Sequence, residues 1–130
     1  MVTKKLLRNI NLSKKYVENV LIVGGGRWAE VHYNEIKKIK NIKKIDFFSI
    51  FNKNYLQKNY SKNKTAIYSD VKKLNKLNYD YVIIATRSKN QKFFLDSFLK
   101  KNNHILCEKP YLLGKKYYLK ILNSLNKRNY

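Results

Sequence analysis

The sequence predicts an α/β protein with a doubly wound parallel sheet, built in three layers and as a single domain. Short apolar runs alternate with helix-spaced segments five times along the 130 residues. The connections between them are short, which favours parallel strands joined by right-handed crossovers. The first apolar run, Val20-Leu21-Ile22-Val23, opens directly into three glycines. A chain of this length is long enough for one domain with its own core.

Each strand is expected where an apolar run is bounded by polar residues. Continuous apolar runs are typical of parallel strands that are covered on both faces. The runs lie at residues 20–23, 45–51, 65–68, 81–85 and 105–107. The domain is expected to span residues 18–130, and residues 1–17 are expected to form a basic N-terminal arm or a short helix.

The helices are expected between these strands, where apolar residues recur every three or four positions. The second covers residues 54–60, and a brief third is capped by Asp70 and ends near Leu77. The buried face of the fourth consists of Phe94, Leu95, Phe98 and Leu99. The first helix turns Ala29, His32 or Tyr33, Ile36 and Ile39 inward. The last, over residues 115–126, has Tyr118, Ile121 or Leu122, and Leu125 on one side.

The loop after the first strand fits the pattern G-x-G-x-x-A. Gly24 permits a tight turn, Gly26 leaves room for a pyrophosphate near the backbone, and Ala29 lets the helix lie close to the sheet. The N-terminus of that helix offers free N–H groups to phosphates. These features predict a Rossmann-like domain that binds a dinucleotide; the alternative is a glycine-rich turn without a ligand. Arg27 either contacts a phosphate or is solvated, and Trp28 is expected to pack at the base of the loop.

The end of the second strand bears on the choice of cofactor. An acidic residue commonly binds the ribose 2′-hydroxyl at this place, but the chain has Asn52 and Lys53 instead. An amide can donate to a 2′-phosphate and an ammonium can neutralise it. The sequence therefore favours NADP, with NAD as the alternative; Lys53 is otherwise one of many surface lysines.

With these motifs in place, the chain from about Asn19 to Leu113 resembles the N-terminal domain of the Gfo/Idh/MocA family of NAD(P)-dependent oxidoreductases. The similarity rests on the glycine loop, on residues 80–86, and above all on residues 103–110, which read NHILCEKP. The resemblance implies that Lys109 is the catalytic lysine, that Glu108 helps to hold the ribose of the cofactor, and that Pro110 fixes the turn. It also implies that Ala85, Thr86 and Arg87 belong to the cofactor site.

The chain departs from the family pattern after Thr86. Gln91 stands where the family has a histidine, and it could bind the cofactor by a hydrogen bond. The alternative is a capping box, in which Ser88 and Gln91 begin the following helix. His32 and His104 are both expected to be structural.

The resemblance also implies a second domain, which supplies the substrate pocket and is absent from these residues. The expected function is therefore one half of an oxidoreductase that transfers hydride between a nicotinamide cofactor and a hydroxyl or carbonyl of a sugar- or polyol-like substrate. The expected partner is the other part of a split enzyme or another copy of the chain. The chain could instead be a truncated form of the enzyme. The alternatives are a dinucleotide-binding module without catalysis and a basic nucleic-acid-binding protein.

The formal net charge of +21 does not by itself define a nucleic-acid surface. Lysine, asparagine, isoleucine and tyrosine make up half of the chain, and the lysines are scattered through every segment, as biased codon usage would produce. No specific nucleic-acid partner is expected. No membrane association is expected either, because no apolar run approaches the roughly 20 residues of a membrane span. No metal is expected. The single cysteine, Cys107, suits a buried hydrophobic position and a cytoplasmic protein.

Overall fold

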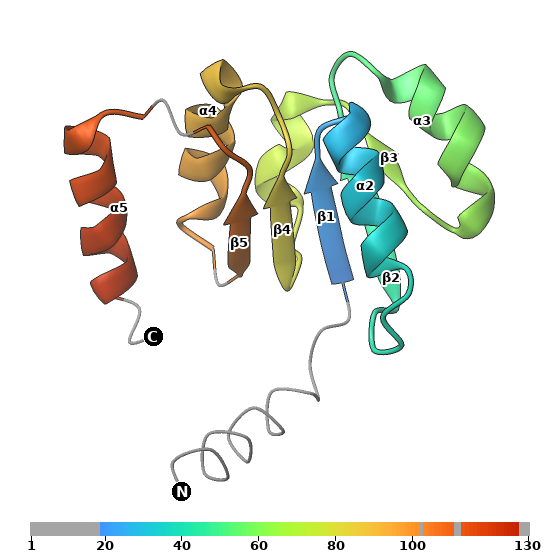
Figure 1. Ribbon diagram of the computed structural model, residues 1–130, viewed down its shortest axis with the longest axis horizontal. Helices are drawn as coiled ribbons and strands as arrows, with labels where there is room; N and C mark the ends of the chain where they lie inside the picture. The colour runs from blue at the N-terminus through green and yellow to red at the C-terminus, as the bar shows by residue number, and fades with distance from the viewer. Residues whose placement is uncertain (1–18, 102, 111–112, 128–130) are drawn as a thin grey trace, which may run out of the picture.

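A single sheet of five parallel strands forms the centre of the protein, and its strand order is β3-β2-β1-β4-β5 (Figure 1). The structure is a computed structural model that describes residues 19–101, 103–110 and 113–127. The predicted arm at residues 1–17 lies outside the described residues. The strands are β1 (Asn19–Val23), β2 (Lys44–Phe48), β3 (Ile67–Tyr68), β4 (Tyr81–Ile84) and β5 (His104–Cys107). The predicted doubly wound parallel sheet is confirmed.

Helices cover both faces of this sheet. The α-helices are α2 (Arg27–Ile36), α3 (Lys53–Tyr60), α4 (Ser88–Phe98) and α5 (Lys115–Asn126), and the 3₁₀ helices are η2 (Ser61–Asn63) and η3 (Val71–Lys76). Alternate residues of β1 point to opposite faces, as a strand requires. Val20 and Ile22 pack with residues of α2 and α3, whereas Leu21 and Val23 pack with residues of η3 and α4. These two cores make the predicted three layers.

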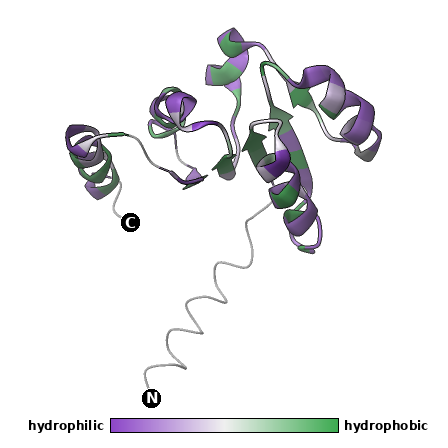
Figure 2. Cartoon of the chain, turned by 45° about the horizontal axis from the view of Figure 1, so that its top comes forward, coloured by the Kyte–Doolittle hydropathy of each residue, from purple (hydrophilic) through white to green (hydrophobic). Residues whose placement is uncertain are grey.

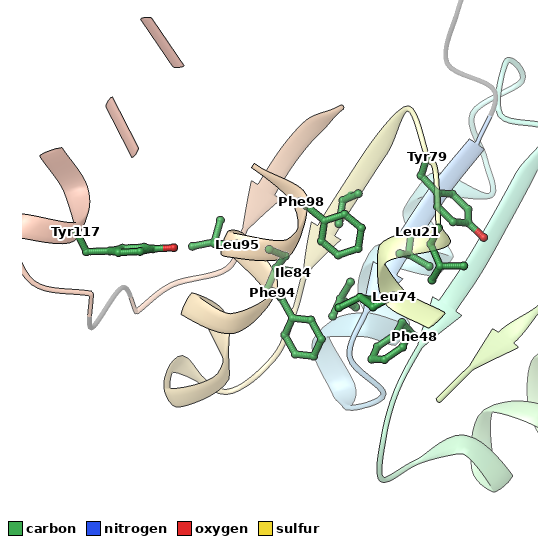
Figure 3. Close-up of a cluster of buried hydrophobic side chains, with 12 residues drawn as sticks. Leu21, Phe48, Leu74, Tyr79, Ile84, Phe94, Leu95, Phe98 and Tyr117 are labelled. Carbon is green, nitrogen blue, oxygen red and sulfur yellow. The ribbon is translucent and has the colours of Figure 1, made fainter. Parts of the chain in front are cut away.

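The larger core lies between the sheet and η3, α4 and α5 (Figure 3). Its centre is aromatic: Phe48 and Phe94 meet edge to face with ring centroids 5.7 Å apart, and Phe98 is fully buried. Figure 2 shows hydrophobic colour concentrated on the central strands and alternating hydrophilic and hydrophobic stretches along the helices. Each helix therefore packs one hydrophobic face against the core and exposes its hydrophilic face, as expected of helices that cover a sheet.

Several predicted boundaries extend too far: the third strand begins at Ile67 instead of residue 65, and the fourth ends at Ile84 instead of residue 85. The second strand ends at Phe48 instead of residue 51, because Ser49 Oγ accepts a hydrogen bond from the backbone N–H of Asn52 and the chain turns there. Phe51 is consequently 87% exposed. The first helix ends at Ile36, and Ile39 lies beyond it on the surface. The brief helix after Asp70 is a 3₁₀ helix, and Asp70 caps it as predicted by accepting from the backbone N–H of Lys72 at 2.9 Å.

The last helix has the predicted bounds, and its predicted face is confirmed only in part: Ile121 packs against the larger core, but the most buried residue is Tyr117 instead of Tyr118. Tyr117 is its buried residue, because its hydroxyl donates to Asp96 of α4 at 2.8 Å while its ring packs into the larger core. Tyr118 and Leu122 remain 37% and 54% exposed. The sequence has apolar residues in two adjacent helical phases here, so periodicity alone did not distinguish them.

Candidate functional site at the carboxyl end of the sheet

Four loops meet at the carboxyl edge of the sheet, toward which the strand arrows point in Figure 1. The backbone N–H of Gly24 donates to the carbonyl of Phe48 at 2.8 Å, and that of Ala85 donates to Val23 at 2.8 Å. The N–H of Glu108 continues the series by donating to Ile84 at 2.9 Å. The loops after β2, β1, β4 and β5 therefore lie side by side in that order. Open α/β sheets bind ligands at this edge.

Three consecutive glycines shape the loop between β1 and α2. Gly24 has φ +132°, and a Cβ there would lie 2.6 Å from the carbonyl oxygen of Ala85, so both its conformation and its contact with the β4 loop require glycine. A Cβ on Gly26 would meet nothing within 4 Å. Gly26 therefore faces open space, as predicted for the residue that a pyrophosphate approaches.

The middle glycine was missed by the sequence analysis, which treated it as a variable position. A Cβ on Gly25 would lie 2.7 Å from both Ser49 Oγ and the Cβ of Asn52. The side-chain amide of Asn52 also donates to the carbonyl of Gly25 at 2.7 Å. Gly25 is thus a packing contact between the two loops. The signal available in the sequence was a third glycine where the pattern asks for none.

Helix α2 begins directly after this loop. Gly26 is its N-cap residue, and no side chain caps the helix, so its first backbone N–H groups have no partner from a capping side chain. Ala29 is completely buried, which confirms its predicted role of letting the helix lie close to the sheet. Trp28 was expected to pack at the base of the loop, and this is wrong, because it is 61% exposed. Asn52 and Leu56 already fill that base against Gly25.

A cleft of about 470 Å³ opens between these loops. Its lining consists of Gly24, Gly25, Gly26, Phe48, Ser49, Ile50, Phe51, Asn52, Ala85, Thr86, Arg87, Lys89, Asn90 and Phe94. The predicted cofactor residues in this lining are Gly24, Gly26, Asn52, Ala85, Thr86 and Arg87. The predicted residues outside it are Arg27, Trp28, Ala29, Lys53, Gln91, Glu108, Lys109 and Pro110.

The charge of the cleft comes from the end of the loop after β4 and from the first turn of α4. Arg87 and Lys89 both line it, whereas Lys53, the predicted cation, does not. The lining residues, all within the described part of the chain, include no carboxylate. Sequence reasoning overlooked Lys89 because a lysine at the start of a helix is unremarkable in a chain this rich in lysine.

The turn after β5 lies one strand beyond the cleft, next to the loop after β4. Gln91 donates its side-chain amide to the carbonyl of Glu108 and is fully buried. The predicted capping box is therefore wrong: Arg87 is the N-cap residue of α4, and no side chain caps the helix. The Oε1 atom of Gln91 and the Oγ1 atom of Thr86 are buried without a hydrogen-bond partner among the described residues.

His32 also reaches this turn. Its Nε2 atom lies 2.7 Å from Oε1 of Glu108, so α2 contacts the end of β5 across a separation of 76 residues. The helical spacing left either His32 or Tyr33 as the inward residue. Tyr33 occupies the core at 5% exposure, and His32, one position earlier, faces Glu108. Lys109 follows as an exposed residue.

Cys107 has the environment of a structural residue. Its side chain packs against the larger core, and burial, with a smaller effect of Glu108, raises the pKa of its thiol to about 11. A thiol with that pKa is almost entirely protonated near neutral pH and is a poor nucleophile. This agrees with the prediction of a small buried hydrophobe.

The described residues form neither a metal site nor a membrane-spanning helix. Residues 19–101, 103–110 and 113–127 contain no group of three His, Cys, Asp or Glu side chains that could hold a metal ion. Across the same residues, every helix is too short or too polar to cross a membrane.

The fold and the cleft together define a dinucleotide-binding α/β domain. The model of the oxidoreductase family with an NAD-binding Rossmann fold, the Gfo/Idh/MocA family, matches residues 18–128, and the chain belongs to this family. The resemblance drawn from the sequence is thereby confirmed. No curated protein matches the chain.

Solved structures show the same fold. The apo scyllo-inositol dehydrogenase from Lactobacillus casei has a TM-score of 0.71 at 20% identity, over 87% of this chain and 34% of that one. The myo-inositol 2-dehydrogenase from Lactobacillus plantarum gives 0.69 at 19% identity, over 86% and 34%. The biliverdin reductase from Synechocystis, in complex with biliverdin and NADP⁺, gives 0.73 at 18% identity, over 88% and 36%. The chain thus spans about a third of the length of these proteins.

Proposed function

We propose that this chain is the NADP(H)-binding half of an oxidoreductase that acts on a hydroxyl or carbonyl group of a sugar- or polyol-like substrate. The observation that carries the proposal is the open space in front of Gly26, between the uncapped N-terminus of α2 and the cleft. A pyrophosphate fits such a place, because backbone N–H groups and the helix dipole both favour negative charge there.

The bound cofactor would supply or accept the hydride. The chain's own residues would hold it across the carboxyl edge, with the adenosine end toward the loop after β2 and the nicotinamide end toward the turn after β5. Gly24, Gly26, Thr86 and Arg87 would hold the first part, and Glu108 the nicotinamide ribose. This order follows the order of the loops along the sheet edge.

The preference for NADP over NAD is proposed from charge. A 2′-phosphate needs a cation or amide nearby and no carboxylate, and Arg87, Lys89 and Asn52 line the cleft without an acidic neighbour in the lining. The NADP⁺ complex of the Synechocystis protein supports the same choice within this fold. Arg87 and Lys89 replace Lys53 as the cations on which the proposal depends.

Lys109 is proposed as the catalytic residue. Its ammonium would orient or polarise the reacting oxygen of the substrate, and proton transfer of this kind needs the group within hydrogen-bond reach. A second domain or a separate partner would bring the substrate to it, because hydride transfer requires both reactants held in register. The inositol dehydrogenases among the structural neighbours support a polyol-like substrate.

The cofactor assignment can be tested with the chain itself. Trp28 is the only tryptophan and lies in the first turn of α2, so its fluorescence reports on ligands at the loop. Titration with NADPH is expected to quench Trp28 and to excite nicotinamide emission, with weaker effects for NADH. Absence of both effects with both cofactors would reject the assignment, and a preference for NADH would reject the NADP choice.

The catalytic assignment needs a second measurement. Alone, the chain is expected to bind cofactor without turning over polyols or sugars. Supplied with a matching substrate domain, it should gain activity that Lys109→Ala abolishes while NADPH affinity stays nearly constant; Lys116→Ala, on α5, is the matched control. Robust dehydrogenase activity of the isolated chain would contradict the half-enzyme proposal.

A further inference from the structure

Glu108, the residue before Lys109, is held by side chains from both faces of the sheet. On one face, His32 of α2 places Nε2 2.7 Å from Glu108 Oε1. On the other face, Gln91 of α4 donates its amide to the carbonyl oxygen of Glu108. The backbone N–H of Glu108 donates in turn to Ile84 at 2.9 Å. All three polar groups of this one residue are therefore bonded, each to a different element.

The contact between His32 and Glu108 is also partly shielded from water. The two side chains are 20% and 23% exposed, whereas the surface pair of Lys38 and Glu35 is 64% and 67% exposed. Exposed pairs contribute little because water and salt screen them. A shielded bond that joins two elements far apart in sequence restricts both more strongly.

We propose that His32 is a positioning residue: together with Gln91 it holds Glu108, and so determines where Lys109 lies in the turn beside the cleft, toward which the nicotinamide is proposed to extend. This inference rests on the proposed function. His32 does not itself reach the reacting atoms; it acts through Glu108, whose backbone leads directly into Lys109. Fixing the backbone of Glu108 also fixes the Cα position from which the flexible side chain of Lys109 extends. A reacting group needs such a defined position relative to its substrate.

A purely structural role for His32 predicts something different. If the bond only ties α2 to β5, its loss would lower stability and weaken every ligand of the cleft alike. If it positions the turn after β5, its loss would weaken only ligands that reach that turn. NADPH reaches it, whereas 2′-phospho-ADP, which lacks both the nicotinamide and the ribose that carries it, ends before it.

The test compares these two ligands on His32→Leu by calorimetry, with His104→Leu as the matched control. His104 is the other histidine of the sequence, and it begins β5. It therefore lies at the amino end of the strands, away from the carboxyl edge where His32 and Glu108 meet. In His32→Leu, NADPH affinity is expected to fall about tenfold, the size of one charge-assisted hydrogen bond. The affinity for 2′-phospho-ADP should stay within about twofold, because that ligand makes no contact with the turn after β5. His104→Leu should change neither affinity.

Two further variants keep the inference testable if His32→Leu folds poorly. His32→Gln retains a side-chain N–H donor and should recover most of the NADPH affinity. Glu108→Gln weakens the same bond from the other side, and its effect should not add to that of His32→Leu in a double-mutant cycle. Additive effects would overturn the inference.

The outcomes separate this inference from the proposed function. Equal weakening of both ligands in His32→Leu, or no change in either, would overturn the positioning role and leave the cofactor assignment intact. Equal affinity of the unmodified chain for both ligands would do the same, because the nicotinamide end would then make no contact. Binding of neither ligand to the unmodified chain would overturn the proposed function and the inference with it.

Discussion

The side-chain amide of Asn52 donates to the carbonyl oxygen of Gly25 at 2.7 Å and thereby joins the loop after β2 to the loop after β1. Asn52 also lines the cleft. One residue therefore stabilises the glycine loop and contributes to the lining at which a 2′-phosphate is proposed to bind.

Replacing Asn52 by aspartate is expected to reverse the cofactor preference. The carboxylate can no longer donate to Gly25, would repel a 2′-phosphate, and could accept from a ribose hydroxyl. NADPH affinity should fall about tenfold or more, at a cost of about 1 kcal/mol in stability from the lost bond. Calorimetry with NADPH and NADH measures both affinities. Asn52→Leu, which removes the bond without adding charge, should weaken NADPH less; an equal loss in the two variants would argue against the charge effect.

The same substitution to alanine should affect stability at Gly25 and cofactor binding at Gly26. Gly25→Ala places a Cβ 2.7 Å from atoms of Ser49 and Asn52, so it should destabilise the domain by about 1–3 kcal/mol through overpacking. Gly26→Ala meets no neighbouring atom and should change stability by less than about 0.5 kcal/mol. Its methyl group would instead reduce NADPH binding. Thermal unfolding and a Trp28 fluorescence titration of both variants distinguish the two effects.

Stability is expected to fall in alkaline solution. Burial, reinforced by a hydrogen bond to Asp46, raises the pKa of Tyr79 far above its usual 10, and burial with a hydrogen bond to Glu30 raises the pKa of Tyr60 to about 12. Above pH 10 the unfolded chain loses these protons while the folded chain retains them, so the free energy of unfolding decreases as pH rises. The contribution of Tyr60 is lost between pH 10 and about 12. Denaturant unfolding at pH 8, 10 and 11 measures the slope, and Tyr79→Phe should make it shallower; an unchanged slope in that variant would refute the role of Tyr79.

Binding to nucleic acid is expected to be weak and without sequence preference. A net charge of +21 produces phosphate contacts wherever lysines happen to lie, and such contacts are lost as salt increases. A gel shift of duplex DNA should disappear by about 200 mM salt. A sequence-dependent shift that persists at that salt concentration would favour a nucleic-acid function over the oxidoreductase proposal.

Local patterns in the sequence were sufficient for the order of elements and for the bounds of α5, because strand and helix periodicities are properties of neighbouring residues. The same holds for the loop from Gly24 to Ala29, where glycines and a small residue are needed by the turn itself. Local signals failed where two solutions were equally periodic. Tyr117 rather than Tyr118 is buried because Asp96, 21 residues earlier on another helix, accepts its hydroxyl.

The arrangement around the turn after β5 was decided only by the tertiary structure. Ser88 and Gln91 satisfy the local rule for a capping box, yet Gln91 is turned inward to the carbonyl of Glu108, which the sheet brings next to it. His32 meets Glu108 across 76 residues for the same reason, since both follow strands that end at one edge. A single sequence records which residue types are present, but contacts between distant segments depend on how the strands pair. Lys109, in the turn after β5, could be proposed as a site residue from its motif, whereas the groups that contact its turn could be found only from the fold.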